Sequence, residues 1–164
     1  MFYFTKISSP LGNLFLVEKK ESLTAIEFSN QSTPSISTPN DAKELWKEEK
    51  TPLLTEVENQ LKEYFIGERK TFDLPLAPRG TLFQFKVWEI LKTIPYGTTM
   101  SYGEQSMQIG GIRYSRAVGG ANGKNPIPII IPCHRVIGKK GELGGFSSGV
   151  DKKRWLLRHE EKHR

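Results

Sequence analysis

The stretch SYGEQSMQIGGIRYSRAVGGANG, Ser101–Gly123, decides which fold the second half of this chain adopts. It divides into two short helical segments, about Tyr102–Ile109 and Tyr114–Asn122. Gly110 and Gly111 lie between them, and two short helices about a glycine turn are typical of a helix-turn-helix. The stretch therefore predicts a helix-turn-helix.

The residues on both sides of this stretch predict further helices. Before it, TLFQFKVWEILKTI has an amphipathic pattern that ends at Pro95 and Gly97, and its expected apolar face is Leu82, Phe85, Trp88 and Leu91. After it come a proline-rich run, a loop rich in glycine and serine, and a closing helix, VDKKRWLLRHEEK. We therefore expect an all-helical C-terminal domain over residues 80–164.

The first part of the chain predicts an α/β domain over about residues 1–70. The segments FYFTKI, NLFLVE and LTAIEF are short, rich in aromatic and β-branched residues, and separated by turns, which predicts a three-stranded antiparallel sheet. Two helices are expected next, DAKELWKEE (41–49) and TPLLTEVENQLKEYFIGE (51–68). Residues 69–80 are interpreted as the linker to the second domain.

Composition limits the classes of protein to which the chain can belong. Its 164 residues carry a formal net charge of +6, which favours an anionic partner, nucleic acid above all. No apolar run is long enough to span a membrane. A single cysteine excludes an intramolecular disulfide and a cysteine-based zinc site, so we expect a cytoplasmic protein, or a nuclear one in a eukaryote.

That cysteine, Cys133, lies in IPCHRVIG, and its surroundings leave two interpretations open. Free cysteines are often small buried apolar residues, and the preceding IPIIIP favours burial. The adjacent His134, with a carboxylate on the closing helix, instead suggests an activated nucleophile in the order Cys, His, acid.

The motifs around Cys133 carry a resemblance. IPCHRVIG, with SRAVGGANGKNPIPI before it and GELGGFSSG and WLLRHEE after it, closely resembles the O6-alkylguanine-DNA alkyltransferases (methylated-DNA–protein-cysteine methyltransferases). The matching motifs cover about residues 80–161. The resemblance implies a monomeric DNA-repair protein that binds double-stranded DNA containing O6-alkylguanine and transfers the alkyl group once to itself. It implies no cofactor and no metal, since the N-terminal half lacks the cysteines and histidines of the zinc site in some relatives.

The resemblance also implies four catalytic residues. Cys133 matches the nucleophile, which forms a stable thioether and so is consumed. His134 matches the general base, and Glu160 matches the acid that polarises it. Tyr102 matches the tyrosine that donates a proton to N3 of the departing guanine.

Three further residues match the pocket for the damaged base. The backbone N–H of Ser147 is expected to reach guanine O6, and the carbonyl groups of Cys133 and Val136 are expected to bind the exocyclic amine. Asn125 matches the asparagine that ties the helix-turn-helix to the active-site loop by hydrogen bonds.

On the DNA side, the base must be flipped out, because the thiol cannot reach O6 in a paired duplex. Arg116 matches the arginine that enters the base stack in its place. Small residues, among them Ser115 and Ala117, let the second helix approach the minor groove closely, and Tyr102 contacts the phosphate behind the flipped nucleotide.

Two alternatives stay open. One is a helix-turn-helix DNA-binding protein without catalysis, which gives no reason for PCHRV. The other is a Cys-His-Glu hydrolase, which would turn over many times. The patch Lys152-Lys153-Arg154 has two interpretations as well, a phosphate contact or solvated surface.

Overall fold

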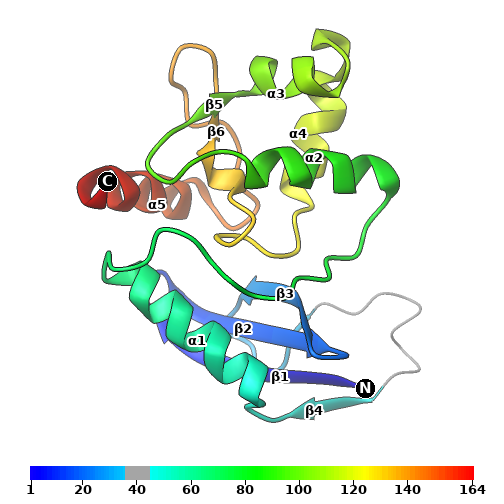
Figure 1. Cartoon of the computed structure of the whole chain (residues 1–164), viewed down its shortest axis with the longest axis vertical. Coiled ribbons are helices and arrows are strands. Elements are labelled where there is room, and N and C mark those ends of the chain that lie inside the picture. Colours follow the sequence, from blue (N-terminus) through cyan, green and yellow to red (C-terminus); the bar gives the residue numbers. More distant parts are fainter. Residues whose placement is uncertain (36–44) are drawn as a thin grey trace. The chain divides into compact units, whose positions relative to one another are not determined.

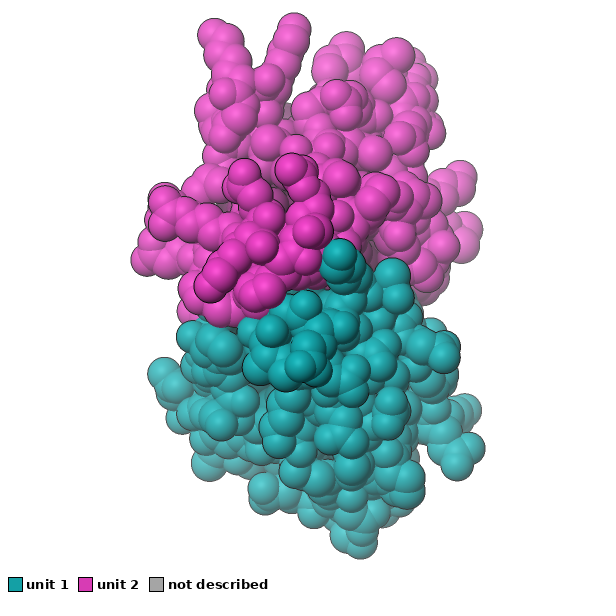
Figure 2. Space-filling model, turned by 60° about the vertical axis from the view of Figure 1, so that its left-hand side comes forward, with its two compact units in different colours: residues 1–79 teal, residues 80–164 magenta. Residues whose placement is uncertain are grey.

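The computed structural model describes residues 1–35 and 45–164. The chain forms two compact units, residues 1–79 and 80–164, which Figure 2 colours separately. None of the described helices is both long and apolar enough to cross a membrane.

The first unit is built on a four-stranded sheet in the order β3-β2-β1-β4 (Figure 1). The three predicted strands are confirmed as β1 (Phe2–Ser9), β2 (Gly12–Lys19) and β3 (Ser22–Phe28), each antiparallel to the next. The short turns between them account for this meander.

The prediction of three strands is wrong in number, and so is that of a purely antiparallel sheet. The fourth strand, β4 (Trp46–Glu48), pairs with β1 in parallel. It lies where a helix over residues 41–49 was expected; residues 41–44 of that prediction lie outside the described part of the chain. The Trp46 ring stacks on the Phe2 ring at 4.4 Å between centroids, so long-range aromatic packing outweighs the local helical pattern.

One helix, α1 (Pro52–Phe65), packs on a face of the sheet (Figure 1). Thr51 caps its first turn by accepting a hydrogen bond from the Leu54 N–H at 3.1 Å. Leu54, Val57 and Leu61 are fully buried, as the apolar spacing predicts.

The second unit contains four α-helices among its described elements, α2 (Leu82–Lys92), α3 (Tyr102–Ile109), α4 (Ser115–Gly123) and α5 (Val150–His163). All four predicted helices are therefore confirmed within about two residues. The expected apolar face of α2 is only half right: Trp88 and Leu91 are buried, but Leu82 is 81% exposed and Phe85 36% exposed. Val87 is buried instead.

The expectation of an all-helical second domain is wrong, because this unit also contains a small sheet, and that sheet holds residues of the candidate site in place. Two very short strands, β5 (Met100–Ser101) and β6 (Val136–Ile137), pair in parallel. Tyr102 directly follows β5, and the 3₁₀ turn η3 (Cys133–Arg135) directly precedes β6. Strand pairing thus brings together residues that lie 36 positions apart in the sequence, Met100 with Val136 and Ser101 with Ile137.

Buried polar contacts fix α4 in its place. The side-chain amides of Gln105 on α3 and Asn122 on α4 exchange two hydrogen bonds of 2.8 Å. Trp88 of α2 donates its indole N–H to the Ala121 carbonyl at 2.9 Å. Between α3 and α4 the chain turns through Gly110, with φ at 155°, and the 3₁₀ turn η2 (Ile112–Tyr114).

Candidate active site

The thiol of Cys133 lies at the wall of a pocket of about 460 Å³. The pocket is lined by residues from α3, from α4, from η3 and from the loop before α5: Tyr102, Gly119, Asn122, Gly123, Cys133, Gly145, Phe146 and Ser147. Cys133 is only 8% exposed, so this pocket is the part of its surroundings from which a reactant can approach. Its volume is within the range of small-molecule sites.

The backbone before Cys133 is held in an unusual conformation. Ile129 is buried with φ at 75°, which is rare for a β-branched residue and costs about 1–3 kcal/mol. Asn125 secures this segment, since its amide donates to the Ile131 carbonyl at 2.7 Å and its oxygen accepts from the Ile127 N–H at 3.0 Å. Through these two hydrogen bonds Asn125 holds the loop that precedes Cys133.

Burial raises the pKa of Cys133, so the thiol is protonated at rest. A hydrogen bond with the Asn125 side chain and the charge of Lys153 act in the opposite direction and favour the thiolate. The pocket therefore holds a thiol that needs a base before it reacts.

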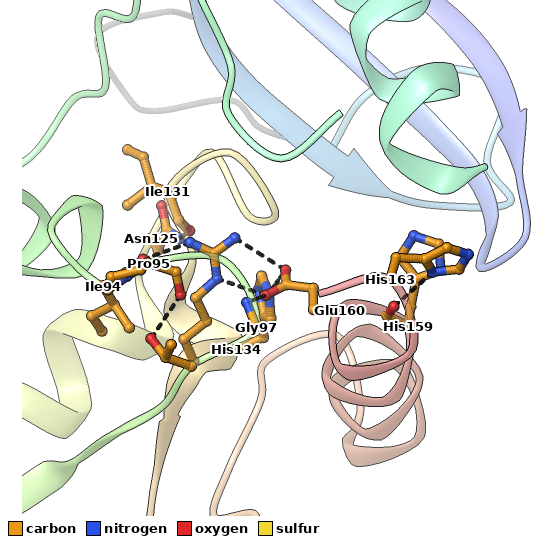
Figure 3. A network of polar contacts seen from close by, with 11 residues as sticks. Ile94, Pro95, Gly97, Asn125, Ile131, His134, His159, Glu160 and His163 are labelled. Atoms are coloured by element: carbon orange, nitrogen blue, oxygen red, sulfur yellow. Dashed lines mark hydrogen bonds and ion pairs between the residues drawn. The ribbon is translucent and has the colours of Figure 1, made fainter. Parts of the chain in front are cut away.

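A buried ionic cluster forms around the two residues that follow Cys133 in the chain, His134 and Arg135. Glu160 of α5 faces His134, whose Nε2 is 2.6 Å from Glu160 Oε2. Arg135 donates to both oxygens of the same carboxylate, from Nε at 2.8 Å and from Nη2 at 3.1 Å. The Gly97 N–H donates a further hydrogen bond at 3.2 Å. Figure 3 shows Glu160 reaching from α5 toward His134 and Gly97, whereas His159 and His163 point away from this network.

This cluster sets the protonation states of its members. Burial alone would raise the pKa of Glu160, but hydrogen bonds and charge from His134 and Arg135 outweigh it and bring the pKa far below its usual range. Burial lowers the pKa of His134 against the raising effect of Glu160, which leaves the imidazole neutral. Because an ionised carboxylate only accepts hydrogen bonds, His134 Nε2 carries the hydrogen and Nδ1 is the basic nitrogen. Nδ1 is buried and has no hydrogen-bond partner in the described residues.

Tyr102 begins α3 and lines the pocket. Ser101 caps this helix in a capping box with Glu104, which fixes where the phenol projects. Burial, and next the charge of Cys133, raise the pKa of Tyr102, while a hydrogen bond with the Gly145 backbone acts to lower it. The phenol therefore keeps its proton at neutral pH.

Lys153 of α5 contacts Tyr102 but does not itself line the pocket. It is fully buried, and its Nζ donates to the Val136 carbonyl at 2.6 Å and to the Gly145 carbonyl at 3.2 Å. The Nζ also lies 3.4 Å from the Tyr102 phenol oxygen. Burial lowers the pKa of Lys153 to about 8.

The other residues singled out from the sequence divide into two groups. Ser147 lines the pocket. Val136 is buried and outside the pocket lining, and its carbonyl accepts a hydrogen bond from Lys153. Arg116 and Ala117 are exposed on α4 and do not line the pocket. Ser115, the first residue of α4, donates its hydroxyl hydrogen to the Ile112 carbonyl of η2 at 2.7 Å and does not line the pocket either.

Comparison with known proteins gives the same family over both halves of the chain. Residues 2–78 match the model described as the ribonuclease-like domain of 6-O-methylguanine DNA methyltransferase, and residues 82–162 match the model of its DNA binding domain. The methylated-DNA–protein-cysteine methyltransferase of Methanosarcina acetivorans is 46% identical over 158 residues, which is 96% of this chain and 97% of that protein. The chain belongs to this methyltransferase family.

Other relatives agree with this assignment. The constitutive methylated-DNA–protein-cysteine methyltransferase of Bacillus subtilis is 42% identical, over 98% of this chain and 96% of its own length. The crystal structure of Mycobacterium tuberculosis OGT in complex with DNA has a TM-score of 0.86 and 42% identity, covering 98% of this chain and 94% of that one. The family resemblance inferred from the motifs is therefore confirmed.

Two charged residues of the site, Lys153 and Arg135, were not predicted from the sequence. Lys153 was grouped with its charged neighbours as a surface patch, yet it is buried. Its spacing held a usable signal, because it precedes Leu156 by three residues and Glu160 by seven, and these positions share one face of a helix. Arg135 has no such signal, since its binding to Glu160 is a contact between distant segments.

Proposed function

We propose that this chain repairs O6-alkylguanine in double-stranded DNA by transferring the alkyl group once to its own Cys133. Binding and transfer reside in residues 80–164, with residues 1–70 as a separate α/β domain. The observation that carries the proposal is a nearly buried thiol on the wall of a base-sized pocket, in a chain of this family.

The thiol is activated by the ionic cluster of His134, Arg135 and Glu160. His134 Nδ1 accepts the proton that leaves Cys133, and the resulting imidazolium is stabilised by Glu160, which Arg135 keeps ionised. The thiolate then attacks the alkyl carbon, and the bond from that carbon to guanine O6 breaks. The product is a thioether, which does not hydrolyse, so each chain acts once.

The pocket binds the base and assists its departure. Tyr102 donates its proton to guanine N3 as negative charge develops on the leaving base. The Ser147 N–H is assigned to O6, and the carbonyl oxygens of Cys133 and Val136 to the exocyclic amine. The Val136 carbonyl already accepts one hydrogen bond, from Lys153, and keeps a second lone pair for the base.

DNA is held by α3 and α4, which we propose form a helix-turn-helix about Gly110 and Gly111. Arg116 is exposed on α4 and enters the base stack when the damaged nucleotide is flipped out. Ser115 and Ala117 are small enough to allow α4 close to the minor groove. Tyr102 contacts the phosphate behind the flipped nucleotide.

The function is tested by mixing the chain with one equivalent of duplex DNA that contains a single O6-methylguanine. Intact-protein mass should rise by one methyl group in place of one hydrogen, peptide mapping should locate it on Cys133, and the duplex should regain guanine. Excess DNA should add no second methyl group. Continued turnover would instead indicate a hydrolase, and DNA binding without any mass change a helix-turn-helix binder.

A Gly144→Ala substitution should slow this transfer about 10- to 100-fold. Gly144 has φ at 69°, and a Cβ there would lie 2.6 Å from the Tyr102 phenol oxygen, so the tyrosine must move. Single-turnover rates of methyl transfer, at saturating DNA, measure the effect.

Gly141→Ala is the matched control for this substitution. Gly141 lies in the same loop with φ at 86°, but a Cβ there meets nothing within 4 Å. This variant carries similar backbone strain without displacing Tyr102, so its transfer rate should equal that of the native chain. An equal slowing in both variants would mean that loop strain, and not the position of Tyr102, limits the reaction.

A further inference from the structure

Lys153 is a buried charge that the proposed chemistry has not used. Its partners are two backbone carbonyls, of Val136 and Gly145, and the phenol oxygen of Tyr102. Within residues 1–35 and 45–164, no carboxylate pairs with its ammonium group. Burying an ammonium group without a counter-charge is costly, so a residue of this kind is expected where its proton or its charge serves the site.

The position of Lys153 relative to Tyr102 indicates that its proton serves the site. Its Nζ is 3.4 Å from the phenol oxygen and 5.5 Å from the centre of the ring. Tyr102 itself lines the pocket. The phenol therefore lies between the ammonium group and the space that the guanine would occupy.

We propose that Lys153 supplies, through Tyr102, the proton that the departing guanine takes up. This inference rests on the proposed function and adds one residue to it. Lys153 acts through the phenol and touches neither the base nor the alkyl group, so it is a positioning and proton-supplying residue behind the catalytic one.

The step balances in atoms and charge. The thiolate sulfur forms its bond to the alkyl carbon while the bond from that carbon to O6 breaks, and the electron pair remains on the guanine. Guanine N3 takes the phenol hydrogen of Tyr102, and the phenolate oxygen takes one hydrogen from the Lys153 ammonium group. The products are a thioether, neutral guanine, neutral tyrosine and a neutral lysine amine.

The direction of proton transfer follows from the surroundings of the two groups. Burial lowers the pKa of Lys153 to about 8, against an opposing effect of the Cys133 charge, whereas burial raises the pKa of Tyr102 above its ordinary value of 10.0. A phenolate here is therefore a stronger base than the lysine amine and takes its proton. The charged and titratable groups near Lys153 are Tyr102, Cys133 and His134, and the charge of Lys153 acts to lower the pKa of His134.

Two methyl donors separate this role from a general electrostatic one. O6-Methylguanine in DNA leaves as a base that needs a proton, whereas iodomethane transfers the same methyl group to Cys133 and leaves as iodide, which needs none. In a Lys153→Met chain, transfer from DNA should fall about 100-fold, while methylation by iodomethane should change less than about tenfold. Lys162→Met removes a lysine from an exposed position of the same helix and should leave both rates unchanged.

The native chain offers a second test that needs no variant. The ratio of the DNA rate to the iodomethane rate cancels the ionisation of the thiol, which both reactions share. Lys153 holds its proton below pH 8 and loses it above, so this ratio should be flat up to about pH 8. It should then fall about tenfold per pH unit.

Each outcome decides one point. If Lys153→Met slows both donors equally, or if the ratio stays flat to pH 10, Lys153 supplies no proton and the inference is overturned. If Lys153→Met does not fold, the pH dependence of the native chain decides alone. A native chain that takes no methyl group from DNA would contradict the proposed function itself, and iodomethane labelling would still report whether Cys133 is reactive.

Discussion

A Cys133→Ser chain will take no measurable methyl group from O6-methylguanine DNA, a loss of at least about 10⁴-fold in rate. Serine keeps nearly the same shape, so the pocket and its neighbours remain in place. A hydroxyl group, however, ionises far less readily than a thiol and is a much weaker nucleophile toward saturated carbon. Intact-protein mass after a single-turnover incubation measures the loss.

The informative control is DNA binding by the same variant. The exposed side chains of α4 lie outside the pocket, so binding of Cys133→Ser to the damaged duplex should stay within about twofold of native in an electrophoretic mobility shift. If the serine chain were methylated, or if the native methyl group mapped to another residue, Cys133 would not be the acceptor.

A Glu160→Gln substitution will have the second large effect, on both stability and transfer. Glutamine fits the same space but removes the charge that balances buried Arg135, and breaking a buried ion pair on one side costs about 3–5 kcal/mol. The amide also supports an imidazolium at His134 poorly, so methyl transfer should fall by about 100-fold or more. Urea unfolding and single-turnover rates measure the two losses.

Glu161→Gln is the matched control, because Glu161 is the next residue on α5 and is exposed. It should change stability by less than about 0.5 kcal/mol and leave transfer unchanged. Comparable losses in both variants would show that the helix, and not the carboxylate cluster, is affected.

The pH dependence of stability gives an independent check on Glu160. Since its pKa is lowered in the folded chain, its contribution is complete above the unfolded pKa of about 4.3 and is lost as the pH falls below that value. Between about pH 5 and 3 the native chain should therefore lose more stability than Glu160→Gln. If the free energy of unfolding fell equally with pH in both chains, Glu160 would not be ionised with a lowered pKa.

Local signals in the sequence predicted most of the secondary structure correctly. Turn residues and alternation located β1 to β3, and helical spacing with capping residues located α1 to α5. Wherever the prediction failed, a partner from elsewhere in the chain decided the outcome. Trp46 lies in a strand because it stacks on Phe2, and the two-residue strands β5 and β6 exist only because each pairs with the other.

The candidate site divides in the same way. The motifs predicted Cys133, His134, Glu160 and Tyr102 as catalytic residues because the resemblance rests on these residues and their neighbours. They did not identify Lys153, whose burial depends on which face of α5 turns inward. They also did not show that a carboxylate twenty-five residues away would bind Arg135 at 2.8 Å.

The sequence by itself thus determined the family, the candidate acceptor thiol and the order of the helices, because these depend on local patterns and on a motif of contiguous residues. The tertiary structure decided the charge states: a neutral histidine with one basic nitrogen, an ionised carboxylate held by arginine, and a lysine acidic enough to give up its proton near pH 8. Burial and distance set those states, and both arise only when distant segments of the chain are packed together.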